Sequence, residues 1–351
     1  MPKLQELRNV NKQLIYGDIG GTKTLLQMAE FKNGAVHERA AHRYHSSDYS
    51  DFADILRDFL DKISVTESHC NPIAACFAVA GPVVAQQAQL TNLPWQMSAA
   101  EIAQAFLIPH VKLLNDFEAA ALAVEILSPD DLVTLQQGRG QAQAMRVILG
   151  AGTGMGVAWL AWQKDSYQPI STEAGHIDFA PTNALQIRLL ETLQKKFQHV
   201  SVERLLSGTG LTHIFNFLQT TSTEFSNFAS IHLEEEDSGA TVTTLAIKQN
   251  HPIAIRSLAL FAEIYGAYAG NLALAGLCRN GVYIAGGIAP RIIHTLRAGG
   301  FMHAFCNKGR FSELMHDIPV QVITNPSVSL LGAKRKAQDL LRIQALGAVK
   351  K

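Results

Sequence analysis

Two segments of this chain follow the same plan, and this internal duplication restricts the possible folds more than any other feature of the sequence. In each segment a short apolar strand leads into a glycine-rich turn and then into two further strand-like runs, at 13–44 and again at 145–172. Helices alternating with strands follow in both copies, a pattern typical of a mostly parallel sheet covered by helices. We therefore predict an α/β protein with two lobes and duplicated βββαβαβα units.

The expected elements follow from the hydrophobic period and from the turn residues between them. In the first copy, strands are expected at 13–19, 25–31, 36–44, 73–80 and 111–114, and helices at 51–63, 99–106 and 117–127. In the second copy, strands are expected at 145–149, 157–162, 167–172, 282–285 and 320–324, and helices at 183–197, 253–277 and 329–346. The polar stretch 219–238 is expected to be a surface excursion.

Length and charge indicate a globular protein without a nucleic-acid-binding face. At 351 residues the chain exceeds the size at which a single hydrophobic core usually stops growing. Its Lys and Arg residues number 30, as do its Asp and Glu residues, so no excess of positive charge is available to neutralise a run of phosphates. We expect no nucleic acid partner.

Cysteine spacing and the apolar runs favour a cytoplasmic protein. The cysteines form no C-x-x-C pair and show no spacing typical of a zinc site, so we expect reduced thiols. Residues 1–12 are polar and charged, unlike a secretory signal. The apolar stretch near 269–277 is interrupted by Gly270, Asn271 and Gly276, so we expect no membrane-spanning segment.

The two glycine-rich turns are candidate phosphate-binding elements. Backbone N–H groups in such turns are exposed, and the lack of side chains lets an anion approach. A P-loop is excluded because Thr22, and not glycine, precedes Lys23, and a dinucleotide fingerprint counted from Gly150 has Met155 where its last glycine belongs. Either turn alone would be interpreted as an ordinary hairpin. Their duplication favours phosphate binding.

A series of motifs then narrows the interpretation. They are GDIGGT at 17–22, AVAGP at 78–82, LTNLPW at 90–95, NDFEA at 115–119, LGAGTG at 149–154, EAGHIDF at 173–179, ERLLSG at 203–208 and VYIAGGI at 282–288. In these motifs, and in their order from about 13 to about 335, the chain resembles the bacterial glucokinase family. That family belongs to the actin, hexokinase and heat-shock ATPase superfamily.

The resemblance implies a fold, a reaction and an assembly. The fold is the two-lobed actin-like ATPase (ribonuclease H-like) fold, with a small lobe at 13–126 plus 327–346, a large lobe at 127–326 and a cleft between the lobes. The implied enzyme is a glucokinase, which transfers the γ-phosphate of ATP to the 6-hydroxyl of glucose, giving glucose 6-phosphate and ADP at the entry to glycolysis. The family further implies a homodimer.

Asp116 is the candidate general base. Phosphoryl transfer needs positioning and charge neutralisation, but the acceptor hydroxyl must still lose a proton. At the end of a strand and the start of a helix, an Asp serves equally well as a helix N-cap, and the residues alone leave these two roles open. The match of Asn115 and Asp116 to the family's sugar-binding pair favours catalysis, with both side chains on the C3 to C6 side of the sugar.

The resemblance places three further residues near the C1 and C2 hydroxyls of glucose, namely Glu173, His176 and Glu203. Side chains that accept and orient hydrogen bonds suit a ring of hydroxyl groups. Without the resemblance, His176 would be interpreted as a core histidine bonded to a carbonyl, and Glu203 as a capping-box partner.

For ATP, the resemblance implies that the phosphates contact both turns and that a third glycine pair lies under the adenosine. The residues concerned are Gly20, Gly21 and Thr22 in the first turn, Gly152, Thr153 and Gly154 in the second, and Gly286 and Gly287 in the third. Asp18 is expected to hold Mg²⁺ through water, since this ion keeps several waters and takes few carboxylates. Alternatively, Asp18 stabilises its turn as an Asx residue, and Lys23 is expected to be an exposed lysine.

Several other functions stay open at this point. The related ROK group of repressors and sugar kinases follows its Glu-x-Gly-His element with zinc-binding cysteines, whereas here no cysteine occurs between that element and Cys278, so zinc is not expected. A kinase for another hexose is the nearest alternative. A chaperone or filament protein shares the fold, and a sugar sensor would bind without turnover, although the Asn115–Asp116 and Glu173–His176 pairs favour a sugar kinase.

Overall fold

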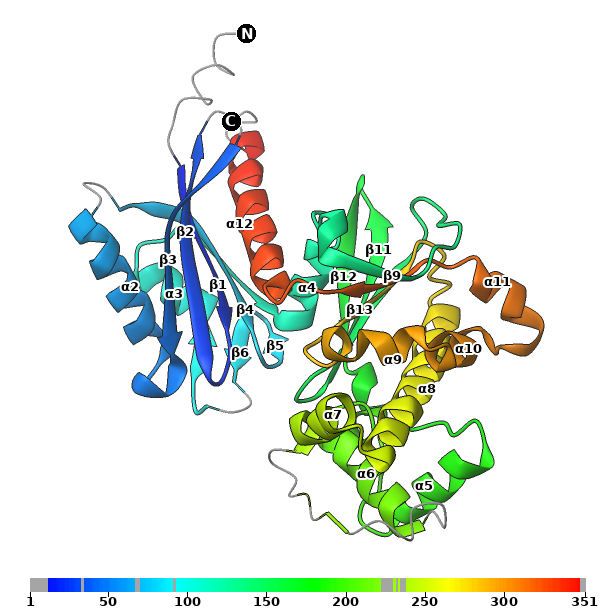
Figure 1. Cartoon of the computed structure of the whole chain (residues 1–351). Coiled ribbons are helices and arrows are strands. Elements are labelled where there is room, and N and C mark those ends of the chain that lie inside the picture. Colours follow the sequence, from blue (N-terminus) through cyan, green and yellow to red (C-terminus); the bar gives the residue numbers. More distant parts are fainter. Residues whose placement is uncertain are drawn as a thin grey trace. The chain divides into compact units, whose positions relative to one another are not determined.

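The computed structural model describes residues 12–32, 35–66, 70–90, 93–221, 230–231, 233 and 238–347. The chain divides into two compact units (Figure 1): unit 1 is Met1–Ile126 with Ser327–Lys351, and unit 2 is Leu127–Pro326. Thr91 and Asn92 of the LTNLPW motif lie outside the described residues, and so does most of the expected surface excursion at 219–238.

Unit 1 contains a five-stranded sheet in the order β3-β2-β1-β4-β8. Its strands are β1 (Lys12–Ile19), β2 (Lys23–Lys32), β3 (Ala35–His45), β4 (Pro72–Val79) and β8 (His110–Asn115). The first three form an antiparallel meander, and β4 and β8 extend it in parallel with β1. Parallel neighbours require crossover connections, which the helices provide.

In the described part of unit 1, four helices cover this sheet, and Figure 1 shows α2 and α3 on one face with α4 and α12 against the other. They are α2 (Phe52–Thr66), α3 (Ala99–Ala105), α4 (Asp116–Ala123) and α12 (Val328–Gly347). Side chains of β1 alternate between the faces: Ile15 and Ile19 pack in the core under α2, while Leu14 and Tyr16 pack in the core under α4 and α12. Because both faces are covered, Leu14, Ile15 and Tyr16 are apolar in succession instead of alternating with polar residues.

The contact between α12 and α4 depends on a glycine. A β-carbon at Gly332 would collide with the backbone of Ala119 on α4. Gly332 therefore lets the last helix of the chain lie directly on α4, the helix that begins at Asp116. Sequence positions more than 200 residues apart thus share one packing layer in unit 1.

A small three-stranded antiparallel sheet also belongs to unit 1 and was absent from the sequence prediction. Its strands are β5 (Val83–Val84), β6 (Gln87–Gln89) and β7 (Gln96–Ser98), in the order β5-β6-β7. Strands of two or three residues are too short to show a hydrophobic period. The hairpin of β5 and β6 follows directly on the Gly81-Pro82 end of the AVAGP motif.

Unit 2 repeats the sheet of unit 1, with the order β12-β11-β10-β13-β14-β9. Its strands are β9 (Leu132–Gln136), β10 (Arg146–Ala151), β11 (Met155–Gln163), β12 (Ser166–Thr172), β13 (Val282–Ala285) and β14 (Val320–Ile323). Again an antiparallel meander is extended by two parallel strands. The strand β9 is an addition at the edge, antiparallel to β14. The duplicated actin-like plan predicted from the sequence is therefore present.

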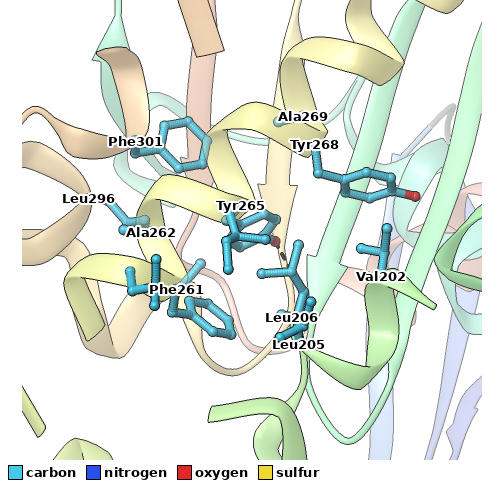
Figure 2. Packing of buried hydrophobic residues seen from close by; sticks show 14 of the residues in the cluster. Val202, Leu205, Leu206, Phe261, Ala262, Tyr265, Tyr268, Ala269, Leu296 and Phe301 are labelled. Carbon is cyan, nitrogen blue, oxygen red and sulfur yellow. Dashed lines mark hydrogen bonds between the residues drawn. The ribbon is translucent and has the colours of Figure 1, made fainter. Parts of the chain in front are cut away.

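One large hydrophobic core holds unit 2 together around α8 (Pro252–Ala275). Figure 2 shows Phe261, Tyr265 and Tyr268 projecting from α8 into this core beside Leu205 and Leu206. The other α-helices among the described residues of this unit are α5 (Ala184–Gln194), α6 (Gly208–Thr221), α7 (Ser238–Gln249), α9 (Ile293–Arg297), α10 (Gly300–Cys306) and α11 (Ser312–His316). Its short 3₁₀ turns are η2 (Pro129–Asp131), η3 (Ala174–His176), η4 (Val202–Arg204), η6 (Ala289–Ile292) and η7 (Gly309–Phe311), and unit 1 has η1 (Ser46–Asp48).

The expectation that no segment reaches membrane-spanning length was wrong for α8. This helix of 24 residues is long and apolar enough to cross a membrane. Two of its glycines are positions of close packing: a β-carbon at Gly266 would collide with Phe301 of α10, and one at Gly270 with Lys308 and the backbone of Phe305. Of its most apolar window, 72% is buried within the protein. The apolar character of α8 is that of a central core helix.

Candidate active site

The candidate residues of unit 1 lie at one edge of its sheet. Asp18 in β1 is in register with Ala78 in β4, and Val79 in β4 is in register with Asn115 in β8. These three strands are parallel, so their carboxyl ends meet at the same edge. Asp18, the Gly20 to Thr22 turn, Asn115 and Asp116 are therefore brought together.

Asn115 is the N-cap of α4. Its Oδ1 accepts hydrogen bonds from the backbone N–H of Phe117 at 2.9 Å and of Glu118 at 3.4 Å. Its Nδ2 donates to the carbonyl of Gly81 at 3.0 Å. An asparagine side chain has two acceptor lone pairs and two N–H donors, so these bonds leave one N–H of Nδ2 to orient toward a ligand.

Asp116 is the first residue of α4. Because Asn115 occupies the N-cap position, the alternative role of Asp116 as the N-cap does not apply. One oxygen of its carboxylate, Oδ1, accepts a hydrogen bond from the N–H of Phe117 at 2.9 Å. A carboxylate in the first turn of a helix lies at the positive end of the helix dipole, which stabilises its charge.

Asp18 and Asp116 lie close enough for their charges to repel. Burial, and then the negative charge of Asp116, raise the pKa of Asp18 to about 6. A cation placed beside this pair would relieve both effects. Among the described residues no group of three or more His, Cys, Asp or Glu is placed to hold a metal ion, and Mg²⁺ fits such a sparse site because water supplies most of its ligands.

The first glycine turn is held by Ser46. Its hydroxyl donates to the carbonyl of Gly20 at 2.7 Å, and its backbone N–H donates to the carbonyl of Thr22 at 3.1 Å. Gly20 N–H closes the turn on the carbonyl of Lys23 at 3.0 Å. Thr22 and Lys23 are exposed, so the turn is fixed at its carbonyls and open at its tip.

The second glycine turn, in unit 2, is similarly fixed from behind. Gly152 N–H donates to the carbonyl of Gly154 at 2.8 Å, and Gly208 N–H donates to the carbonyl of Gly152 at 2.9 Å. A β-carbon at Gly152 would meet no atom within 4 Å. The packing of the protein therefore does not require glycine at 152, and Thr153 at the tip is exposed.

The third glycine pair sits at the end of β13, next to the second turn. Gly286 has a φ of +82°, and a β-carbon there would lie 2.9 Å from the backbone nitrogen of Ala151. A β-carbon at Gly287, in contrast, would meet nothing within 4 Å. Packing and backbone conformation explain Gly286, whereas Gly287 faces open space.

Glu173, His176 and Glu203 come together on the surface of unit 2. The Nε2 atom of His176 is 4.0 Å from Oε2 of Glu173, and its Nδ1 is 4.0 Å from Oε1 of Glu203. The side chain of His176 is 59% exposed, so it is not a core histidine. The segments that carry these three residues pair with each other, since the N–H of Val202 donates to the carbonyl of Ile177 at 2.9 Å. This pairing brings the three side chains together.

Glu203 does not act in a capping box. Its Oε2 accepts a hydrogen bond from the backbone N–H of Met155 at 2.9 Å, and a β-carbon at Gly154 would lie 2.5 Å from the same oxygen. The Glu203 carboxylate thus reaches the second glycine turn, and the missing side chain of Gly154 makes room for it. Sequence reasoning missed this contact, which joins positions 48 residues apart.

Two tyrosines of α8 support this region from the core (Figure 2). The hydroxyl of Tyr265 accepts a hydrogen bond from the N–H of Ala151, the last residue of β10, at 3.2 Å. The hydroxyl of Tyr268 donates to the carbonyl of Ala174, in the turn that carries His176, at 2.7 Å. The turn and the Glu173 to His176 segment therefore rest on one rigid helix. Nothing in the sequence distinguished these tyrosines from other core residues.

Comparison with known proteins gives one consistent answer. The family model described as Glucokinase matches residues 15–340. A glucokinase from Nostoc punctiforme is 41% identical over 335 residues, covering 91% of this chain and 97% of that protein.

Solved structures agree with the sequence matches. The crystal structure of a glucokinase from an Antarctic psychrotroph has a TM-score of 0.81 and 30% identity, with 93% of this chain and 99% of that chain covered. A ROK family glucokinase from Streptomyces griseus, in complex with glucose and AMPPNP, has a TM-score of 0.58 at 18% identity, with 93% and 99% covered. The latter likeness concerns the fold alone.

Proposed function

This chain belongs to the glucokinase family, and we propose that it transfers the γ-phosphate of ATP to the 6-hydroxyl of glucose, giving glucose 6-phosphate and ADP. The family and its relatives make the chain an ATP-dependent sugar kinase. The roles of individual residues in this reaction are our own assignment.

The observation that carries the assignment is the position of Glu203 in unit 2. One of its carboxylate oxygens holds the glycine turn, and the other faces His176. A cluster suited to hydroxyl groups and a turn suited to phosphate are therefore neighbours on the same unit. A sugar kinase has to bind its sugar and the phosphates of its nucleotide close together, and this arrangement supports that requirement.

We assign Glu173, His176 and Glu203 to the C1 and C2 hydroxyls of glucose. Their exposed carboxylate and imidazole groups accept and orient hydrogen bonds from sugar hydroxyls. We assign Asn115 and Asp116 to the C3 to C6 side. Asn115 is held rigidly by its bonds to α4 and to Gly81, so its remaining N–H has a fixed direction, as a selective site needs.

Asp116 is the general base in this proposal. Its carboxylate accepts the proton of the 6-hydroxyl while the oxygen of that hydroxyl attacks the γ-phosphorus of ATP. The bond from this phosphorus to the bridging oxygen of the β-phosphate breaks, and ADP leaves. The backbone N–H of Phe117 on Oδ1 orients the carboxylate. A positioned base of this kind contributes about 10²- to 10⁴-fold to the rate.

For the nucleotide, the two glycine turns bind phosphate through backbone N–H groups, and Gly286 and Gly287 lie along the adenosine. Gly152 and Gly287 each have open space where a side chain would stand, which suits close approach by a ligand. When bound, Mg²⁺ would neutralise phosphate charge. Asp18 is the residue that would hold it through water, beside Asp116.

Cytoplasmic location and a homodimer complete the proposal. Both are what the resemblance to the family implies, and the burial of α8 in the core of unit 2 supports the first of them. Mannose, fructose or an N-acetylated hexose as the acceptor is the alternative to glucose. The same cluster of carboxylates and imidazole suits any of these sugars.

A coupled assay of ADP release tests the function directly. The purified chain is supplied with Mg²⁺ and ATP and with glucose, mannose, fructose or N-acetylglucosamine in parallel. We expect the highest kcat/KM with glucose, and we expect NMR to identify the product as glucose 6-phosphate. A higher kcat/KM with another hexose would overturn the substrate assignment, and an absence of sugar-dependent ADP release would overturn the kinase assignment.

A further inference from the structure

Gln86 occupies a strained position in the hairpin of β5 and β6. This hairpin turns at Ala85 and Gln86, whose φ angles are 49° and 64°. Two-residue hairpin turns favour such left-handed values, which Asn and Gly normally supply. Other side chains cost free energy in this conformation, so the strain persists only where the surroundings hold it.

The side-chain amide of Gln86 provides that hold. Its Oε1 accepts a hydrogen bond from the backbone N–H of Leu113 at 3.0 Å, and its Nε2 donates to the carbonyl of Leu113 at 3.4 Å. Leu113 lies in β8, the edge strand of the five-stranded sheet. The glutamine amide therefore pairs with an edge residue as the backbone of a further strand would.

This contact is two residues from Asn115 and three from Asp116. Asn115 is bonded to the same connection, through its Nδ2 and the carbonyl of Gly81. Gln86 is in turn anchored to α3, because its own carbonyl accepts a hydrogen bond from the N–H of Ala99 at 3.0 Å. The segment 81–86 is thus hydrogen-bonded to the end of β8 at two residues, Leu113 and Asn115, next to the proposed base.

We propose that Gln86 is a positioning residue for Asn115 and Asp116, an inference that rests on the function proposed for that pair. The side-chain amide of Gln86 fixes the free edge of β8 at Leu113. The strained turn is retained because it places this amide at the edge. Without it, the end of β8 has one lateral support fewer. A misplacement of about 1 Å in a catalytic group costs on the order of 10²-fold in rate.

Two glycine substitutions distinguish the effect of the Gln86 side-chain amide from the effect of the strained turn conformation. Gln86→Gly removes the amide and suits a φ of 64°, so the relief of strain offsets the loss of the two hydrogen bonds. Ala85→Gly relieves the neighbouring strained residue, which is exposed, and leaves the amide in place. We expect Gln86→Gly to lower kcat at least tenfold with a Tm close to that of the wild type, and Ala85→Gly to keep the wild-type kcat.

A third variant tests the chemistry of the contact. Gln86→Glu keeps an acceptor for the N–H of Leu113 and loses the donor to its carbonyl. Its kcat is expected between those of the wild type and Gln86→Gly. If Gln86 is only a turn residue, Gln86→Gly will be at least as active as Gln86→Glu, and that order would overturn the proposal.

Amide hydrogen exchange at Leu113 provides a readout that does not depend on turnover. Exchange is expected to be faster in Gln86→Gly than in Ala85→Gly. Unchanged exchange, or faster exchange with a kcat within twofold of that of Ala85→Gly, would each refute the positioning role. If the wild type releases no ADP with any sugar, the proposed function fails instead, and exchange still shows whether Gln86 holds β8.

Discussion

The carboxylate of Glu203 links the second glycine turn to the candidate sugar-binding cluster, because its Oε2 accepts a hydrogen bond from the backbone N–H of Met155 at 2.9 Å. Its Oε1 faces Nδ1 of His176 at 4.0 Å. A single side chain is therefore in a position to affect both the sugar and the phosphate parts of the site. Substitution of its neighbours should affect only one part.

Glu203→Ala is expected to raise KM for glucose and for ATP, each by on the order of tenfold, because it removes a sugar ligand and releases the turn at Met155. His176→Ala keeps the bond to Met155, so only KM for glucose should rise. Steady-state kinetics with each substrate varied in turn measures both. The same ratio of KM changes in the two variants would contradict the double role of Glu203.

Asp116→Asn is expected to lower kcat by on the order of 10²-fold or more, the scale of a lost general base. The asparagine amide keeps an oxygen for the N–H of Phe117, so the fold and much of the glucose affinity should be retained. Glu118→Gln is the matched control, since it removes a charge from the same first turn of α4. If both variants have similar kcat values, the loss reflects the helix terminus and not a base.

The strand plan was predictable because it rests on local pattern. The strand expected at 282–285 is β13 (Val282–Ala285), and the strand at 320–324 is β14 (Val320–Ile323). Apolar runs bounded by turn residues fix such strands. The helix expected at 117–127 begins one residue earlier and ends at Ala123, where the N–H groups of Val124 and Ile126 bond to carbonyls three residues back. The apolar run continues past this point, so the pattern did not show where the helix stops.

Long-range contacts of the site could not be predicted. Motif resemblance selected Glu203 and Asn115, but their bonds to Met155 and to Gly81 depend on how separate segments fold back. Gln86 was missed because its importance lies in a positive φ and in a contact with an edge strand. No local signal marked this turn, because Ala85 and Gln86 stand where a two-residue hairpin turn usually has Asn or Gly.

The neighbours Gly286 and Gly287 have different expected roles, Gly286 a structural one and Gly287 a ligand-binding one. Gly286→Ala is expected to lower the free energy of unfolding by roughly 1–3 kcal/mol, because φ is +82° and the backbone of Ala151 is too close. Gly287→Ala should leave stability within about 0.5 kcal/mol, since its space is open.

Kinetics on the same pair tests the nucleotide assignment. If adenosine passes along Gly287, the added methyl group in Gly287→Ala should raise KM for ATP severalfold with little change in KM for glucose. Thermal unfolding and KM measurements on both variants check the two expectations. A Gly287→Ala variant with wild-type KM for ATP would place the nucleotide elsewhere.

Asp18→Asn is expected to stabilise the ligand-free protein and to inactivate the enzyme. Asp18 is largely shielded from solvent, and this desolvation and then the negative charge of Asp116 raise its pKa to about 6. Its ionised form therefore destabilises the fold at neutral pH. A shift of one pKa unit corresponds to about 1.4 kcal/mol, so the neutral isostere should raise the free energy of unfolding by about 1 kcal/mol or more. Asp48→Asn, which removes an exposed carboxylate of the same unit, should change neither stability nor kcat.

Loss of the proposed Mg²⁺ ligand should at the same time lower kcat of Asp18→Asn by at least tenfold, and the concentration of Mg²⁺ needed for half-maximal activity should rise. Denaturant unfolding without nucleotide measures the first effect, and assays over a range of Mg²⁺ concentrations measure the second. The two effects have opposite signs, so a general folding defect cannot produce both. A less stable Asp18→Asn protein would refute the electrostatic argument, and an unchanged requirement for Mg²⁺ would remove Asp18 from the metal site.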